Sequence, residues 1–304
     1  MELSAWRSDA TTSEKRATLR IMELSVILAG LAASLSWGVG DFSGGLASRK
    51  APVLRVVLAS QLIGTSILIL LGLASGEALP GTAELLLYSL GGVAGAAAVP
   101  LFYLSMARGK MGVAAPLTAL ASGGIPLLVG LLTEGLPSSM QLGGFALALA
   151  ALWLIARPGN GEPVHLPDVW MPLLAGLGFG IYLTILGRAD PSGGFIWPLA
   201  TSRLVSIVLL SGIVLGTSRR KMPRREVGAF PWPLTALSAL GDMGGYSLFT
   251  IASQLGRLDV AAVLSSLYPA VTALLAWWVL RERLAPRQTV GVVMALLAVA
   301  MIAL

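Results

Sequence analysis

Ten long apolar runs restrict what this chain can fold into. Each is about 20 residues long, which is the length a helix needs to cross the hydrocarbon core of a bilayer. Several contain no charged side chain, including 56–76, 113–133 and 260–280. The sequence therefore predicts an all-α membrane protein of ten transmembrane helices. The predicted runs are 24–47, 54–76, 84–107, 111–133, 137–157, 169–187, 194–216, 230–255, 259–280 and 285–304.

The composition agrees with lipid as the outer solvent. Of the 304 residues, 56% are hydrophobic and only 12% are charged, whereas soluble chains carry about 25% charged residues. The net charge is +6, but the basic residues lie almost entirely between the apolar runs. That placement suits anionic lipid headgroups and predicts no nucleic-acid partner. With no cysteine and a single histidine, His165, between runs five and six, we expect no metal and no cofactor.

The two halves of the chain resemble each other. Residues 109–115 (GKMGVAA) match 256–262 (GRLDVAA) at an offset of 147 residues, and 28–31 match 174–177 exactly in sequence at an offset of 146. Glu134 likewise matches Glu282. Chance similarity between alanine-rich helices explains one such match, but not an ordered series that includes polar landmarks. We interpret the series as an internal duplication.

Each predicted repeat has five runs, and five is an odd number. The second repeat must therefore cross the membrane in the opposite sense to the first, as inverted repeats around a central cavity do. The predicted organisation is a polar N-terminal tail over 1–23, repeat one over 24–157, a linker over 158–168 and repeat two over 169–304.

The distribution of basic residues predicts an orientation in the cell membrane. Loops on the side of the N-terminus carry six lysines and arginines, and loops on the opposite side carry fourteen. Cytoplasmic loops are the basic ones. The count therefore favours both termini outside the cytoplasm.

The second repeat carries a recognisable string. It reads Leu267-Tyr268-Pro269-Ala270-Val271-Thr272, followed by Glu282-Arg283-Leu284 and by Gln288 with Gly291. Together with Ser36-Trp37-Gly38 in run one, this string resembles the ten-helix EamA-type branch of the drug/metabolite transporter superfamily. The resemblance covers residues 24–304 and is weaker in the first half. It implies a central cavity and secondary transport, often export, of amino acids or other small metabolites. Many members are thought to have cytoplasmic termini, which conflicts with the charge count.

Charged side chains within the runs are the first candidates for a binding site, because a charge in hydrocarbon is costly unless it faces a cavity or a partner. Asp242 in run eight shares a helical face with Tyr246, and Arg203 lies in run seven. Asp242 is a candidate site for a substrate amine or a proton. Alternatively, Asp242 and Arg203 form an ion pair that only holds two helices together.

Asp41 in run one shares a face with Trp37. It lies either in the cavity or, as Arg49 and Lys50 follow closely, at headgroup level. If Asp41, Asp242 and Arg203 line one cavity, a zwitterion such as an amino acid would satisfy all three.

Run nine offers hydroxyl groups beside a helix-breaking residue. Ser265, Tyr268 and Thr272 share one face next to Pro269, which frees a backbone carbonyl one turn earlier. Broken helices often line transporter sites, although a simple packing kink explains the pattern as well. Tyr103 is a further candidate for the cavity, or else an aromatic anchor at the membrane interface.

Two other function classes compete with transport. The sequence Gly38-Val39-Gly40-Asp41 is similar to the Gly-x-Gly-Asp element of intramembrane aspartyl proteases, in which Asp242 would be the second carboxylate. However, the remaining protease elements are missing, so we do not expect an enzyme. An uncoupled channel or a scaffold is the other alternative, and the oligomeric state is left open.

Overall fold

Helices form every regular element in the described part of the chain. The computed structural model describes residues 2–108, 111–156, 166–189, 194–218, 229–281 and 285–303. The predicted linker residue His165, the repeat landmark Lys110 and the motif residues 282–284 lie outside these ranges. The helices are α1 (Glu2–Lys50), α2 (Val53–Ser75), α3 (Thr82–Arg108), α4 (Met111–Thr133), α5 (Ser139–Ala156), α6 (Leu166–Gly187), α7 (Ile196–Ser218), α8 (Trp232–Leu255), α9 (Leu258–Ser265), α10 (Tyr268–Leu280) and α11 (Pro286–Ala303).

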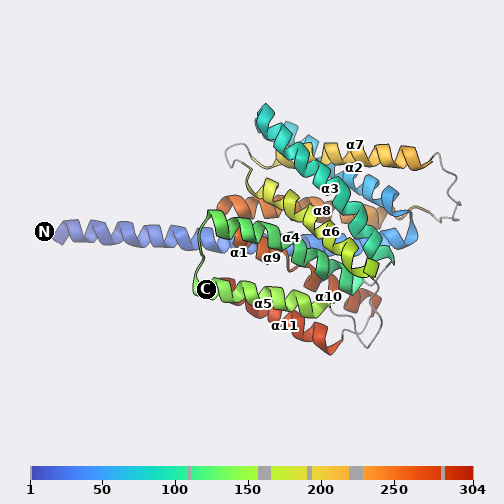
Figure 1. Cartoon of the computed structure of the whole chain (residues 1–304). Helices are drawn as coiled ribbons and strands as arrows, with labels where there is room; N and C mark the ends of the chain where they lie inside the picture. The colour runs from blue at the N-terminus through green and yellow to red at the C-terminus, as the bar shows by residue number, and fades with distance from the viewer. Residues whose placement is uncertain are drawn as a thin grey trace.

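The helices follow the predicted apolar runs, with two differences. Helix α1 begins at Glu2, so the predicted polar tail is helical and continuous with the first run. Figure 1 shows this first part of α1 reaching beyond the bundle. The ninth run forms two helices, α9 and α10, in place of one.

Seven segments of the described chain are long and apolar enough to cross a membrane. They lie in α1 to α4, α6 and α7, and in α9 with α10 taken together. Helices α5 and α11 are apolar, but their described apolar segments are shorter. Helix α8 is not among the seven, because Asp242 and several serines, threonines and glycines lower its hydropathy. That α5, α8 and α11 also cross the membrane, which would make ten spans, remains a prediction.

The outer surface of the bundle is strongly apolar. Leu70, Leu73, Leu132 and Trp278 expose between 68% and 84% of their surface. Such exposure over many helices is not compatible with water as the surrounding solvent. The multi-pass membrane nature of the chain follows from this surface and from the candidate spans.

Pairs of helices from the two halves of the chain pack against each other. Helix α1 packs along α8, α3 along α6, α2 along α7, and α5 along α11. Figure 1 shows α5 and α11 side by side at one edge of the bundle, and α2 and α7 near the opposite edge. Helices α1, α3, α4, α6 and α8 to α10 lie between these two edges and surround the candidate site.

The break between α9 and α10 has a local cause. Pro269 is the second residue of α10 and has no N–H to donate to the Ser265 carbonyl one turn earlier. The chain leaves the α-helix at Ser266 and Leu267 and resumes it at Tyr268. By contrast, α4 contains Pro116 and Pro126 and stays continuous. The broken helix predicted in run nine is therefore confirmed.

Candidate functional site

Helices α1 and α8 cross at very close range and bring two carboxylates to the same level. A methyl group added to Gly40 would lie 2.9 Å from the backbone nitrogen of Asp242. At the same crossing, the Ser36 hydroxyl donates a hydrogen bond of 2.8 Å to the Gly241 carbonyl. Only glycines permit this approach of two backbones. Asp41 follows Gly40 and Asp242 follows Gly241 in the sequence. The crossing therefore places the two carboxylates beside one another on adjacent helices.

Asp242 forms an ion pair with Arg203 of α7. Arg203 Nη2 lies 2.6 Å from Asp242 Oδ2, which is the length of a strong charge-assisted hydrogen bond. The Arg203 side chain is almost fully buried, whereas that of Asp242 is 25% exposed. Asp242 is thus neutralised on one side and open on the other. The sequence-based suggestion that these two residues pair is confirmed.

The open side of Asp242 faces a cavity that we call the main cavity because it holds the buried charges; the space around its lining is about 400 Å³ when the open solvent at its mouth is included. Asp41 also lines this cavity and has no hydrogen-bond or ion-pair partner among the described residues. An ionised carboxylate without a partner in such a site would be strongly destabilising, so a ligand or a proton is needed there. The lining is formed by Trp37, Asp41, Phe102, Ser122, Phe179, Leu183, Asp242, Tyr246, Ser266 and Tyr268.

Aromatic rings form one wall of the main cavity. The Trp37 ring is 5.0 Å from that of Tyr246 and 6.2 Å from that of Tyr268, both in edge-on geometry. The guanidinium carbon of Arg203 lies 5.5 Å from the centre of the Tyr246 ring. Aromatic faces stabilise cations by about 0.5–2 kcal/mol. A positively charged group next to Asp41 therefore has both a carboxylate and rings available to it.

Of the nine residues predicted from the sequence, five line the main cavity and Arg203 lies next to it. The other three have different surroundings. The Tyr103 hydroxyl bonds Ser238 Oγ at 2.9 Å, and Thr272 Oγ1 donates to the carbonyls of Tyr268 and Gly38. Ser265 bonds the Ala262 carbonyl, and its neighbour Ser266 takes its place in the cavity. The helix break after Ser265 changes the direction in which the next side chains point. The prediction assumed a continuous helix and therefore placed Ser265, in place of Ser266, in the cavity.

Several cavity residues were not predicted. Phe102, Phe179 and Leu183 lack a polar atom in the side chain and look like any other apolar residue of a span. Gln61 of α2 is different, because it is a buried amide within 56–76, a stretch without charged residues. It bonds Ser206 of α7 at 3.1 Å, and a polar group inside a span is a signal that sequence reasoning can use.

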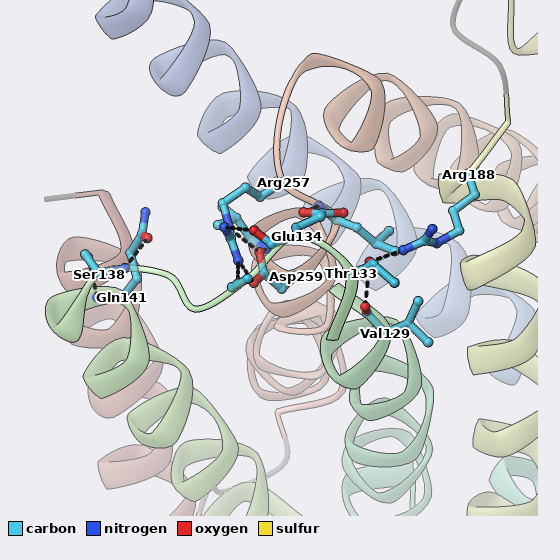
Figure 2. A network of polar contacts seen from close by, with 11 residues as sticks. Val129, Thr133, Glu134, Ser138, Gln141, Arg188, Arg257 and Asp259 are labelled. Atoms are coloured by element: carbon cyan, nitrogen blue, oxygen red, sulfur yellow. Dashed lines mark hydrogen bonds and ion pairs between the residues drawn. The ribbon is translucent and has the colours of Figure 1, made fainter. Parts of the chain in front are cut away.

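A second polar cluster closes one end of the bundle (Figure 2). Arg257, between α8 and α9, donates hydrogen bonds of 3.2 Å and 2.6 Å to the carbonyls of Glu134 and Gly135. The Glu134 carboxylate accepts a bond of 3.1 Å from the Leu258 nitrogen at the start of α9. Arg188, at the end of α6, donates to Thr133 Oγ1. We call the set Thr133, Glu134, Arg188, Arg257 and Asp259 the terminal clamp.

The terminal clamp joins landmarks from both halves of the chain. Asp259 lies 2.6 Å from Arg257 and is itself fully buried. The hydrogen bond from Arg257 to Asp259 raises the pKa of Arg257, so the arginine keeps its charge. Glu134 and Arg257 each belong to the repeated segments, but their counterparts Glu282 and Lys110 lie outside the described residues.

The site does not have the geometry of an aspartyl protease. That chemistry needs two carboxyl groups that share a proton. Asp242 instead bonds Arg203, and no hydrogen bond joins it to Asp41 in the described structure. Within the described ranges, no three histidine, cysteine or acidic side chains gather in a way that could hold a metal ion.

Comparisons with known proteins agree with the fold and the membrane setting. Residues 166–304 match the model of the EamA-like transporter family. Among solved structures, 28 chains match. One of them, described only as the crystal structure of a protein, has a TM-score of 0.71 and 18% sequence identity, and the match covers 92% of this chain and 98% of that one. At this identity the likeness concerns the fold alone. No curated protein matches the chain.

Proposed function

We propose that the chain is a secondary transporter that moves small solutes across the cell membrane by alternating access, because residues 166–304 match the EamA-like transporter family. The family is one of membrane transporters within the drug/metabolite transporter superfamily. The observation that carries the proposal for this chain is the main cavity, which Asp41 and Asp242 line from two helices, with Arg203 of a third helix bonded to Asp242 beside it. Ionisable groups inside a membrane usually mark a transport pathway.

The packing of the helices supports two inverted repeats of five. If α1 to α5 correspond in order to α6, α7, α8, α9–α10 and α11, then the pairs α1–α8 and α3–α6 exchange with each other. The pairs α2–α7 and α5–α11 map onto themselves under the same exchange. This is the pattern that a two-fold axis between two repeats produces, and such an axis passes through the substrate site of many transporters.

The charges of the site favour a cation as part of the transported species. Asp41, Asp242 and Arg203 sum to one negative charge when all three are ionised. A charge of this kind in a low-dielectric site is stable only when it is offset. Either a ligand ammonium group or a proton does this. Exchange of the two at Asp41 would couple solute movement to protons, and net export is the direction that the family resemblance favours.

The terminal clamp supports a state that is closed at one membrane face. It ties the end of α4 to the start of α9 and to the end of α6. Alternating access requires such contacts to form at one face while the other is open. The clamp is therefore expected to break when the cavity opens toward that face.

Vesicle uptake tests the proposal. The purified chain, reconstituted in lipid vesicles, is expected to move radiolabelled small amines or amino acids saturably. Asp242→Asn should reduce uptake at least tenfold, while Glu84→Gln at the surface, where the carboxylate bonds Gly81 N, should not. Uptake that rises linearly with concentration, or full activity of Asp242→Asn, would contradict a carrier with this site.

A further inference from the structure

A separate pocket lies at the end of the bundle where α1 extends beyond the other helices (Figure 1). The space around its lining is about 780 Å³ when the open solvent at its mouth is included, about twice the corresponding value for the main cavity. Its lining comes from α1, α5, α9, α11 and the junction of α8 with α9. It shares Arg257 with the terminal clamp and no lining residue with the main cavity. We call it the α1 pocket.

The α1 pocket has an apolar interior and a polar mouth. Val26, Val260 and Ile302 line it and are almost fully buried. Glu23, which is exposed, and Gln141 add polar groups to the same lining. Glu23 directly precedes the first predicted membrane run, so the mouth lies near the level of the lipid head groups. An amphiphile with its tail inside and its head at the mouth matches this division.

The mouth carries one negative charge that the described residues do not offset. The charged members of the terminal clamp, Glu134, Arg188, Arg257 and Asp259, sum to zero when all four are ionised. Arg257 is bonded to Asp259 at 2.6 Å and to two backbone carbonyls. Glu23, by contrast, has no hydrogen bond or ion pair with any described residue. A head group that is positively charged and donates hydrogen bonds therefore complements the mouth.

From this arrangement we propose that the α1 pocket binds a membrane lipid with a primary ammonium head group, of the phosphatidylethanolamine type. The ammonium group bonds the Glu23 carboxylate, and one acyl chain packs against Val26, Val260 and Ile302. The side-chain oxygen of Gln141 accepts a bond from the Ser138 nitrogen, so its amide N–H groups are the donors left for the lipid phosphate.

Other lipid classes match the α1 pocket less well. An anionic lipid such as phosphatidylglycerol would place a second negative charge beside Glu23, because the charge of Arg257 is already offset by Asp259. The choline head group is cationic but has no N–H to donate. The inference goes beyond the proposed transport function and does not depend on it, since the two cavities have separate linings.

A matched lipid series tests the head-group specificity. The full chain, purified in detergent, is titrated with phosphatidylethanolamine, phosphatidylcholine and phosphatidylglycerol, each with two oleoyl chains, and bound lipid is counted by native mass spectrometry. One charge-assisted hydrogen bond at a partly exposed site is lost with the other two head groups. We therefore expect phosphatidylethanolamine to bind about fivefold more tightly than either.

A substitution at the mouth tests the role of the carboxylate. Glu23→Gln should lower the affinity for phosphatidylethanolamine to that for phosphatidylcholine. Glu84→Gln makes the same change at the start of α3, outside the α1 pocket, and should leave the preference intact.

A bulky side chain inside the pocket tests where the acyl chain lies. Ile27 lines the α1 pocket, whereas its neighbour Leu28 is 58% exposed on the outer surface. Ile27→Trp should weaken phosphatidylethanolamine binding about fivefold or more, because the larger ring fills the space of the chain. Leu28→Trp should not, and thermal unfolding verifies that both variants are folded.

Three results would overturn the proposal. Equal binding of the three lipids would mean ordinary contact with the surrounding bilayer only. Tightest binding of phosphatidylglycerol would refute the ammonium contact with Glu23. A preference for phosphatidylethanolamine that survives both Glu23→Gln and Ile27→Trp would place the lipid elsewhere on the chain. None of these results affects the transport proposal, which vesicle uptake tests separately.

Discussion

The Arg203–Asp242 ion pair gives the sharpest test of whether these buried charges serve stability, transport or both. Each single neutralisation leaves one partner behind. In Arg203→Gln, Asp242 keeps its charge but loses the bond of 2.6 Å; in Asp242→Asn, the arginine is left almost fully buried without its ion-pair partner. Breaking a buried pair from one side destabilises a protein by about 3–5 kcal/mol.

The double variant Arg203→Gln/Asp242→Asn removes both charges and retains two groups that can hydrogen-bond. Replacing a whole buried pair is often close to neutral. We therefore expect the double variant to be more stable than either single variant, with a coupling free energy of about 2 kcal/mol or more in the double-mutant cycle. Thermal unfolding in detergent, followed by the fluorescence of the eight tryptophans, measures this cycle.

Transport separates the two roles of the pair. If the pair only held α7 against α8, the double variant would regain vesicle uptake together with stability. We expect it to remain inactive, because Asp242 also lines the main cavity. Additive stabilities of the single variants would refute the energetic reasoning, and an active double variant would refute the role in binding.

Three further predictions concern the helix crossing and the terminal clamp. Gly40→Ala should lower stability by about 1–3 kcal/mol, because the added methyl group meets the α8 backbone at 2.9 Å; Gly212→Ala, where nothing lies within 4 Å, should raise it slightly. Thermal unfolding of both variants, each compared with the unchanged protein, measures whether stability falls in the first and rises in the second. Arg257→Ala removes the bonds to Glu134 and Gly135, each contributing about 1 kcal/mol, and should increase thiol labelling of a cysteine placed at Ser266 from the clamp's face about thirtyfold. Because the pKa of Arg257 is raised, its stabilising contribution is lost only at a pH above the usual arginine range, so the difference in melting temperature between the unchanged protein and Arg257→Ala should stay constant between about pH 6 and 9; a difference that shrinks within this range would contradict the assignment.

The helices were predictable because the signal for each is local. An apolar run of about 20 residues specifies a helix in lipid without knowledge of its neighbours. The break at Ser266 was also visible, since Pro269 removes a specific hydrogen bond. What the sequence could not determine is the helical phase after the break, and so Ser265 was expected where Ser266 lies.

The candidate site was predictable only in its charged part. Asp41, Arg203 and Asp242 are conspicuous in apolar helices, because the membrane makes each of them costly. The pocket beside Arg203 depends on which helices meet, and Ser202 and Ser206 look like any serines of a span until α2 packs against α7 and Tyr182 of α6 joins the same lining. The terminal clamp was equally hidden. The repeat pattern singled out Glu134 and Arg257, but only tertiary packing brings the two into contact.

In alternating access, the cavity around Asp41 and Asp242 opens to both faces of the membrane in turn. The chain has no cysteine, so Ser266→Cys places a single thiol in the cavity wall with little change in size. Rates of labelling by a membrane-impermeant thiol reagent, measured from each side of sealed vesicles, test the claim directly. We expect labelling from both sides and protection by a transported solute, with no labelling of the buried control Ser105→Cys. A thiol at position 266 that reacts from one side only, whatever solute is present, would contradict alternating access.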